Sequence, residues 1–141
     1  MKKLEFSIDI NAPKEKVWDV LWNDATYPQW TAVFSEGSRA ESDWKEGSKV
    51  LFLDGKGNGM FSKIKTLEEN RSMVFEHIGE FSNGVEKPQD WGGATESYFL
   101  SEKDGITELG VELFGTEEHK DYFKDIFPKA LEKVKELAEK A

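Results

Sequence analysis

The sequence predicts an α+β fold, in which a long helix at the end of the chain covers the concave face of an antiparallel sheet. Three observations predict it. Apolar and polar residues alternate from Leu4 to Ile10, as they do in a half-buried strand. Short segments with turn residues between them follow through the middle of the chain. From Glu117 onward, apolar residues recur at helical spacing instead.

The first strand is expected to give way to a helix from about Pro13 to Trp22. Proline suits the first turn of a helix, because the backbone N–H that it lacks would have no partner there. Asn23 and Asp24 end this helix, and a short second helix or turn is expected at about Ala25 to Trp30.

The middle of the chain is predicted to be strands joined by turns. Asp54-Gly55 is typical of a hairpin, since this pair supplies the positive φ angles that such turns need. A longer loop is expected from about Phe81 to Gly93. The expected strands are Ser38 to Asp43, Lys49 to Leu53, Met60 to Leu67, Met73 to Ile78, Ala94 to Ser101 and Ile106 to Phe114.

The last segment is predicted to be one amphipathic helix, with Lys and Glu on the face opposite its apolar stripe. Pro128 lies inside this pattern and removes one backbone hydrogen bond, so we expect a kink or a break there. The stripe is formed by Phe123, Ile126, Phe127, Ala130, Leu131, Val134, Leu137 and Ala138.

Length and composition exclude several classes of protein. The 141 residues are expected to form one domain, residues 1–141. The chain has no cysteine and two histidines, which excludes disulfides and cysteine-ligated zinc, and we expect no metal and no other cofactor. The net charge of −9 disfavours nucleic acids and anionic membranes as partners. Neither a signal peptide nor an apolar run of roughly 20 residues is visible, so we expect a cytoplasmic protein without membrane insertion.

The segment from Ile8 to Leu21 resembles the opening of the START-like (SRPBCC) superfamily, in which Ile-x-Ala-Pro is followed by x-x-Val-Trp-x-x-Leu. Tyr27-Pro28-Gln29-Trp30 is similar to the Tyr-x-x-Trp that follows in that superfamily. The resemblance implies a helix-grip fold, with a curved antiparallel sheet of about six or seven strands wrapped around the C-terminal helix and two short helices after the first strand. Further matches resemble the branch of activator of heat-shock-protein ATPase homologues, at Glu46-Gly47, Gly59, Arg71 to Phe75 and Thr107 to Leu113.

Three functions follow from this resemblance. Members of the superfamily commonly bind lipids, steroids, polyketides or other hydrophobic small molecules in an apolar cavity between sheet and helix. The leading hypothesis is therefore non-enzymatic binding of a hydrophobic or amphipathic small molecule. The alternatives are a cyclase or hydrolase that uses the same cavity, and a chaperone-related protein-interaction module. A protein partner or a homodimer remains open.

The candidate site combines polar and aromatic residues. Alternation places His77 on the strand face of Phe75, and Glu96 on the face of Tyr98. If both faces point inward, a His, a Glu and a Tyr hydroxyl converge in the cavity, where they would orient a ligand, act as acids and bases, or only satisfy one another. A register slip of one residue would turn Glu96 outward. The aromatic residues either line the cavity or fill the core. The candidate ligand-binding residues are Trp30, Phe75, His77, Trp91, Glu96, Tyr98, Phe123 and Phe127, and none is assigned a catalytic role.

Overall fold

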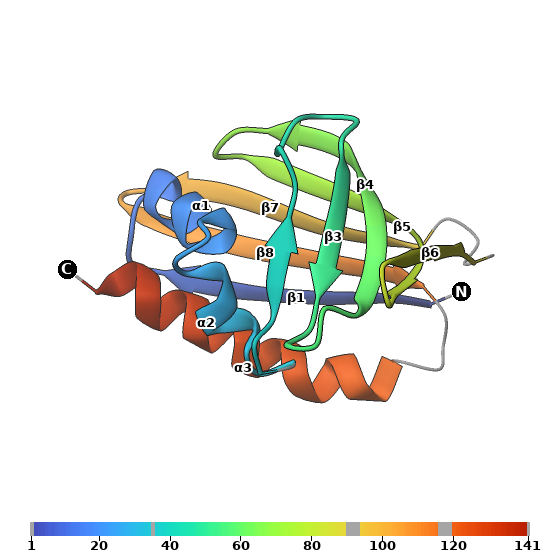
Figure 1. The fold of residues 1–141 in the computed structure, drawn as a ribbon. Helices are drawn as coiled ribbons and strands as arrows, with labels where there is room; N and C mark the ends of the chain where they lie inside the picture. The colour runs from blue at the N-terminus through green and yellow to red at the C-terminus, as the bar shows by residue number, and fades with distance from the viewer. Residues whose placement is uncertain (1, 35, 90–93, 116–119, 141) are drawn as a thin grey trace.

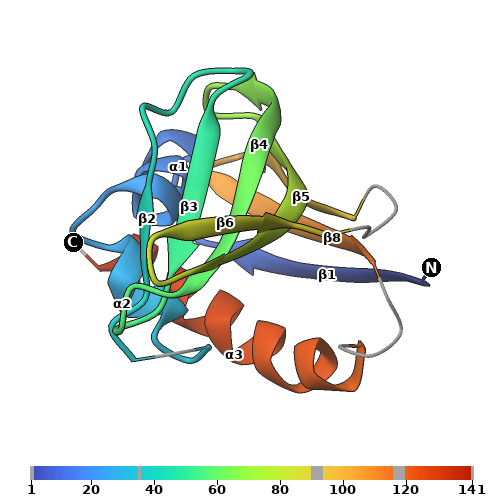
Figure 2. The ribbon, with the colours of Figure 1, turned by 45° about the vertical axis from the view of Figure 1, so that its right-hand side comes forward.

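The computed structural model describes residues 2–34, 36–89, 94–115 and 120–140. Figures 1 and 2 show a strongly curved sheet that bends around the long helix α3 (Lys120–Glu139), which runs along β1. The shorter helices α1 (Lys14–Trp22) and α2 (Tyr27–Thr31) pack against α3 and against each other. The predicted α+β helix-grip architecture is confirmed.

The described strands form a single antiparallel sheet. Their order across it is β1-β8-β7-β5-β4-β3-β2, and β6 pairs with β5 outside this path. The path therefore has seven strands, within the predicted range, and β6 is additional. The strands are β1 (Lys2–Ile10), β2 (Arg39–Glu41), β3 (Lys49–Leu53), β4 (Gly59–Glu68), β5 (Ser72–Ser82), β6 (Val85–Pro88), β7 (Thr95–Lys103) and β8 (Ile106–Gly115).

The prediction of a loop from Phe81 to Gly93 is wrong as far as Pro88, because β5 continues to Ser82 and the chain then turns back to form β6. Asn83 and Gly84 both have positive φ, 52° and 78°, which suits the two-residue turn between these strands. Gly79 permits the pairing, since a Cβ there would lie 2.3 Å from the carbonyl oxygen of Lys87. Residues 90–93, which include Trp91, lie outside the described part of the chain.

Helix α3 continues through Pro128, so the expected break does not occur. The carbonyl that loses its helical partner there belongs to Lys124, four residues earlier. Both Lys124 and Pro128 are exposed, and water can satisfy that carbonyl. The proline is tolerated for this reason.

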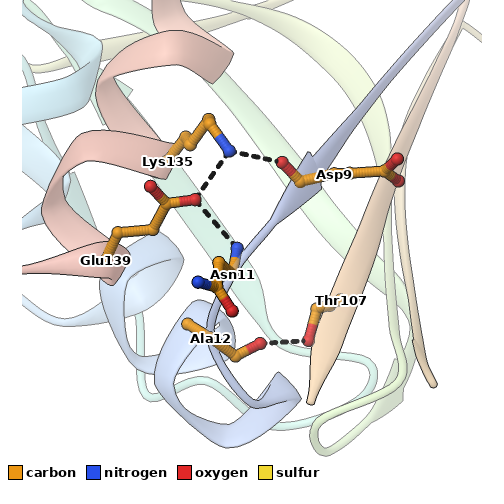
Figure 3. Close-up of polar contacts among 6 residues, drawn as sticks. All are labelled: Asp9, Asn11, Ala12, Thr107, Lys135 and Glu139. Atoms are coloured by element: carbon orange, nitrogen blue, oxygen red, sulfur yellow. Dashed lines mark hydrogen bonds and ion pairs between the residues drawn. The ribbon is translucent and has the colours of Figure 1, made fainter. Parts of the chain in front are cut away.

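The C-terminal half of α3 is fastened to the end of β1 (Figure 3). Lys135 Nζ donates to the carbonyl oxygen of Asp9 at 2.8 Å and to the carboxylate of Glu139 at 2.6 Å. The same carboxylate accepts the backbone N–H of Asn11 at 2.8 Å. Next to these contacts, Thr107 Oγ1 donates to the carbonyl of Ala12 at 2.7 Å in a buried site. This end of the helix is thereby held at a fixed position on the sheet.

The solid core occupies only one end of the space between sheet and helix. Ile10 at the end of β1 and Val134 in the second half of α3 are both fully buried there. Leu4 and Phe123, nearer the other ends of the same two elements, line a cavity instead. Each long element thus contributes to the core with one end and to the cavity with the other. Buried core residues include Val17, Val20, Leu21, Val50, Ile64, Met73, Leu109, Val111, Ala130 and Leu131.

Candidate functional site

The cavity lies between the concave face of the sheet and the N-terminal half of α3, and its volume is about 560 Å³. This volume is in the range of pockets that hold small molecules. Its walls are mostly apolar and aromatic, with a few polar side chains among them. The lining includes Leu4, Tyr27, Trp30, Phe34, Phe52, Met60, His77, Glu96, Tyr98, Leu113, Phe123 and Phe127.

Helix α2 supplies one aromatic wall. The Trp30 indole N–H donates to the carbonyl of Leu21 at 3.2 Å, at the end of α1, and this hydrogen bond fixes the ring. Its ring then meets Tyr27 and Tyr98 in edge-to-face contacts, with centroid separations of 5.4 and 6.3 Å. Such contacts stabilise aromatic clusters beyond the area that they bury.

Helix α3 supplies the opposite wall. Phe127 stacks on Phe6 of β1 at 5.3 Å and meets Phe34 at 5.1 Å. Phe123, one turn earlier, packs on Phe127 at 5.9 Å. The aromatic residues predicted for this helix therefore face the cavity, because the apolar stripe of α3 points toward the sheet along its whole length.

A polar cluster interrupts these apolar walls. His77 Nε2 lies 3.2 Å from Glu96 Oε1, and the two side chains are only 12% and 17% exposed. On the other side of the ring, His77 Nδ1 lies 2.6 Å from Ser62 Oγ. The Tyr98 hydroxyl donates to the second oxygen of Glu96. The strands explain this convergence, since Ser62 of β4 pairs with His77 of β5, and Glu96 lies on β7, which pairs with the other edge of β5.

One arrangement of hydrogens satisfies every member of this cluster. With an ionised Glu96, His77 Nε2 carries a hydrogen and donates it, because a carboxylate can only accept. Nδ1 of a neutral ring then accepts from the Ser62 hydroxyl. Every polar atom of the cluster has a partner in this arrangement, which is what a mostly buried site requires.

Two phenols stay protonated beside this carboxylate. Burial raises the pKa of Tyr98, and the negative charge of Glu96 raises it further. The same two causes, in the same order, raise the pKa of Tyr27. Both hydroxyls therefore keep their hydrogens at neutral pH, and Tyr98 remains a donor to Glu96.

The structure distributes the candidate residues as follows. Trp30, His77, Glu96, Tyr98, Phe123 and Phe127 line the cavity. Phe75 does not; it is fully buried and contacts the rings of Phe52 and Tyr98, which do. Trp91 lies outside the described residues.

Sequence reasoning missed Ser62, Phe34, Phe52 and Leu113. For Ser62 a signal existed: it alternates with Ile64 against Lys63 and Lys65, which indicates a buried position. For Phe52 the pattern was ambiguous, because apolar residues occupy both faces of its strand.

Ser62, His77 and Glu96 are the residue types of a hydrolase triad, but their arrangement does not suit nucleophilic attack. Ser62 is fully buried and does not line the cavity. Both nitrogens of His77 are engaged, one by Ser62 and one by Glu96. The geometry instead suits Ser62 to orienting the His77 imidazole, and through it the Glu96 carboxylate.

A curved antiparallel sheet around a C-terminal helix, with a cavity between them, defines a START-like protein of the helix-grip class. The chain belongs to the family described as "Activator of Hsp90 ATPase homolog 1-like protein", which matches residues 11–139. This match confirms the predicted resemblance to the branch of activator of heat-shock-protein ATPase homologues. A comparison with curated proteins finds no match. Within the described residues, no helix has the length and apolar character needed to cross a membrane.

Several solved structures share the fold. The solution structure of the Aha1 dimer from Colwellia psychrerythraea is 20% identical, with a TM-score of 0.77 over 99% of this chain and 97% of that chain. Protein MLL2253 from Mesorhizobium loti is 15% identical, with a TM-score of 0.74 and 96% of each chain covered. CalU16 from Micromonospora echinospora is 16% identical, with a TM-score of 0.69 over 96% of this chain and 75% of that chain. At these identities the likeness establishes the fold alone.

Proposed function

We propose that this protein binds a hydrophobic or amphipathic small molecule in the cavity between the sheet and α3. The observation that carries the proposal is the cavity itself, about 560 Å³ in volume and lined by aromatic rings around one polar cluster. Removing about 250 Å² of apolar ligand surface from water would contribute roughly 6 kcal/mol before ordering costs. The polar cluster would fix the orientation of the ligand.

The two alternatives receive less support. A protein-interaction module needs an exposed docking face and does not require a cavity of this size. A cyclase or hydrolase needs a group that is free to exchange a proton with its substrate, whereas His77 is engaged at both nitrogens. Binding without turnover is therefore the function that we propose.

Native mass spectrometry of the protein purified from its own host, followed by extraction, tests the proposal. We expect a stoichiometric small-molecule adduct, or saturable binding of apolar compounds added afterwards. Leu113→Trp should reduce binding, since Leu113 lines the cavity and a larger ring would fill it. The matched control is Phe99→Trp on the neighbouring strand, where the side chain is 40% exposed and does not line the cavity. No binding by the natural chain, or equal binding by both variants, would overturn the proposal.

A homodimer is a second proposal, supported by the dimeric Aha1 from Colwellia psychrerythraea that shares the fold. Light scattering during size-exclusion chromatography should give about twice the 16.1 kDa mass of one chain. A single-chain mass at every concentration tested would contradict it.

A further inference from the structure

The charges around the cavity are predominantly negative. Among the described lining residues, the carboxylates are Asp54, Glu80 and Glu96, and Arg39 is the one Lys or Arg side chain. Arg39 is partly neutralised, because its Nε lies 3.1 Å from the carboxylate of Glu41. The Glu96 side chain is only 17% exposed, whereas Glu80 is exposed, and a charge held away from water favours a counter-ion.

The hydrogen bonds of the cluster leave acceptors rather than donors for a ligand. His77 and Tyr98 each direct a hydrogen to Glu96, one to each carboxylate oxygen. Each of these oxygens can still accept another hydrogen bond. Among the described residues, no Lys or Arg side chain forms an ion pair with Glu96. A ligand that carries both a positive charge and hydrogen-bond donors would supply what the cluster lacks.

Aromatic rings next to Glu96 favour the same chemistry. Trp30 contacts the rings of both Tyr27 and Tyr98, and all three line the cavity together with Glu96. Cations bind to the faces of such rings within about 6 Å of the centroid. The Tyr27 hydroxyl makes no hydrogen bond to any residue that the structure describes, so it is available to a bound molecule.

We propose that the cavity selects a ligand with a protonated amine, whose ammonium group lies between Glu96 and the rings of Tyr27, Trp30 and Tyr98. The apolar body of this ligand lies along Phe34, Leu113 and the phenylalanines of α3. A carboxylic acid with the same apolar body is disfavoured, because its charge would face Glu96. The proposal rests on the proposed function of the cavity and specifies the chemical class of its ligand.

Three probes with the same tail test the proposal: decylamine, decanol and decanoate, titrated by calorimetry at neutral pH, the two ionic probes below their micelle concentrations and decanol below its solubility limit. We expect the amine to bind at least roughly tenfold more tightly than the alcohol, which is the size of a charge-assisted hydrogen bond. Decanoate should bind more weakly than the alcohol. This ranking needs no variant of the protein.

The variant Glu96→Gln keeps the shape of the side chain and removes its charge. We expect it to lose the preference for decylamine over decanol, while Glu80→Gln, an exposed residue of the same lining, should retain it. Decanoate binding as tightly as decylamine, or a preference unchanged in a folded Glu96→Gln protein, would overturn the amine proposal. Binding of none of the three probes would instead count against the cavity as a binding site.

Discussion

The orientation of His77 depends on a hydroxyl that never reaches the cavity. Ser62 Oγ lies 2.6 Å from His77 Nδ1, and we infer that it donates to this nitrogen and so keeps the ring hydrogen on Nε2, facing Glu96. Ser62→Ala removes that donor with a change of one oxygen atom. His77 Nδ1 would then lack a partner in a site where the side chain is 12% exposed.

The magnitude follows from the cost of leaving a buried polar atom without a partner, about 2 kcal/mol. For a chain of this length, such a loss lowers the melting temperature by roughly 5–8 °C. Ser97→Ala is the matched control, because Ser97 is also buried but makes no hydrogen bond to a described residue. Its effect on the free energy of unfolding should stay below about 0.5 kcal/mol.

Two measurements check this reasoning. Urea unfolding compares Ser62→Ala with Ser97→Ala, and ¹⁵N NMR of the imidazole reports which nitrogen carries the hydrogen. We expect the hydrogen on Nε2 in the natural chain. A spectrum with the hydrogen on Nδ1 of a neutral ring, or equal stability of the two variants, would refute the proton order on which the amine proposal depends.

Three further predictions concern the frame around the cavity. Thr107→Val removes a fully buried hydrogen bond and should cost about 2 kcal/mol in urea unfolding; a loss below about 0.5 kcal/mol would contradict this. The hydrogen bond from Lys135 lowers the pKa of Glu139 in the folded protein. The ionised carboxylate therefore stabilises the fold at pH values above its ordinary pKa. This stabilisation is lost as the pH falls through the lower pKa of the folded state. Glu139→Gln should therefore lose less stability than the natural chain between neutral pH and about pH 3, and an unchanged pH dependence would count against the contact. Gly79→Ala should lower the free energy of unfolding by about 1–3 kcal/mol, because the new Cβ would meet the carbonyl oxygen of Lys87. Faster amide hydrogen exchange in β6 would show that its pairing with β5 is weakened. Unaltered exchange would contradict this prediction.

The fold could be predicted because its signals are local. Alternation in β1 places Leu4, Phe6, Ile8 and Ile10 on one face, and the structure pairs that face with the inward residues of β8. A strand with one apolar face has little freedom in its register. The β6 hairpin was overlooked although Asn83-Gly84 is a strong turn signal, because polar residues follow it and no apolar alternation marks a strand.

The candidate site was less accessible to sequence reasoning. Pairing of His77 with Glu96 could be anticipated from two strand faces. Alternation could place Ser62 in the interior, but not opposite His77, because the register of its strand is irregular. A shift between Phe61 and Ser62 buries both of them, which strict alternation does not allow. The size of the cavity depends on how far the first half of α3 stands from the sheet, and no local pattern encodes that distance.

The division of each long element into a core end and a cavity end has a consequence for how this protein can change. Residues such as Leu113 and Phe123 face the cavity, whereas Leu109 and Val134 on the same elements are buried in the core. Under the proposed function, mutations at the cavity ends would alter specificity while the core that supports folding stays intact. With this separation, substitutions that change the cavity leave the protein stable enough to fold. A protein only 15% identical shares this backbone, and a shared backbone does not fix what is bound.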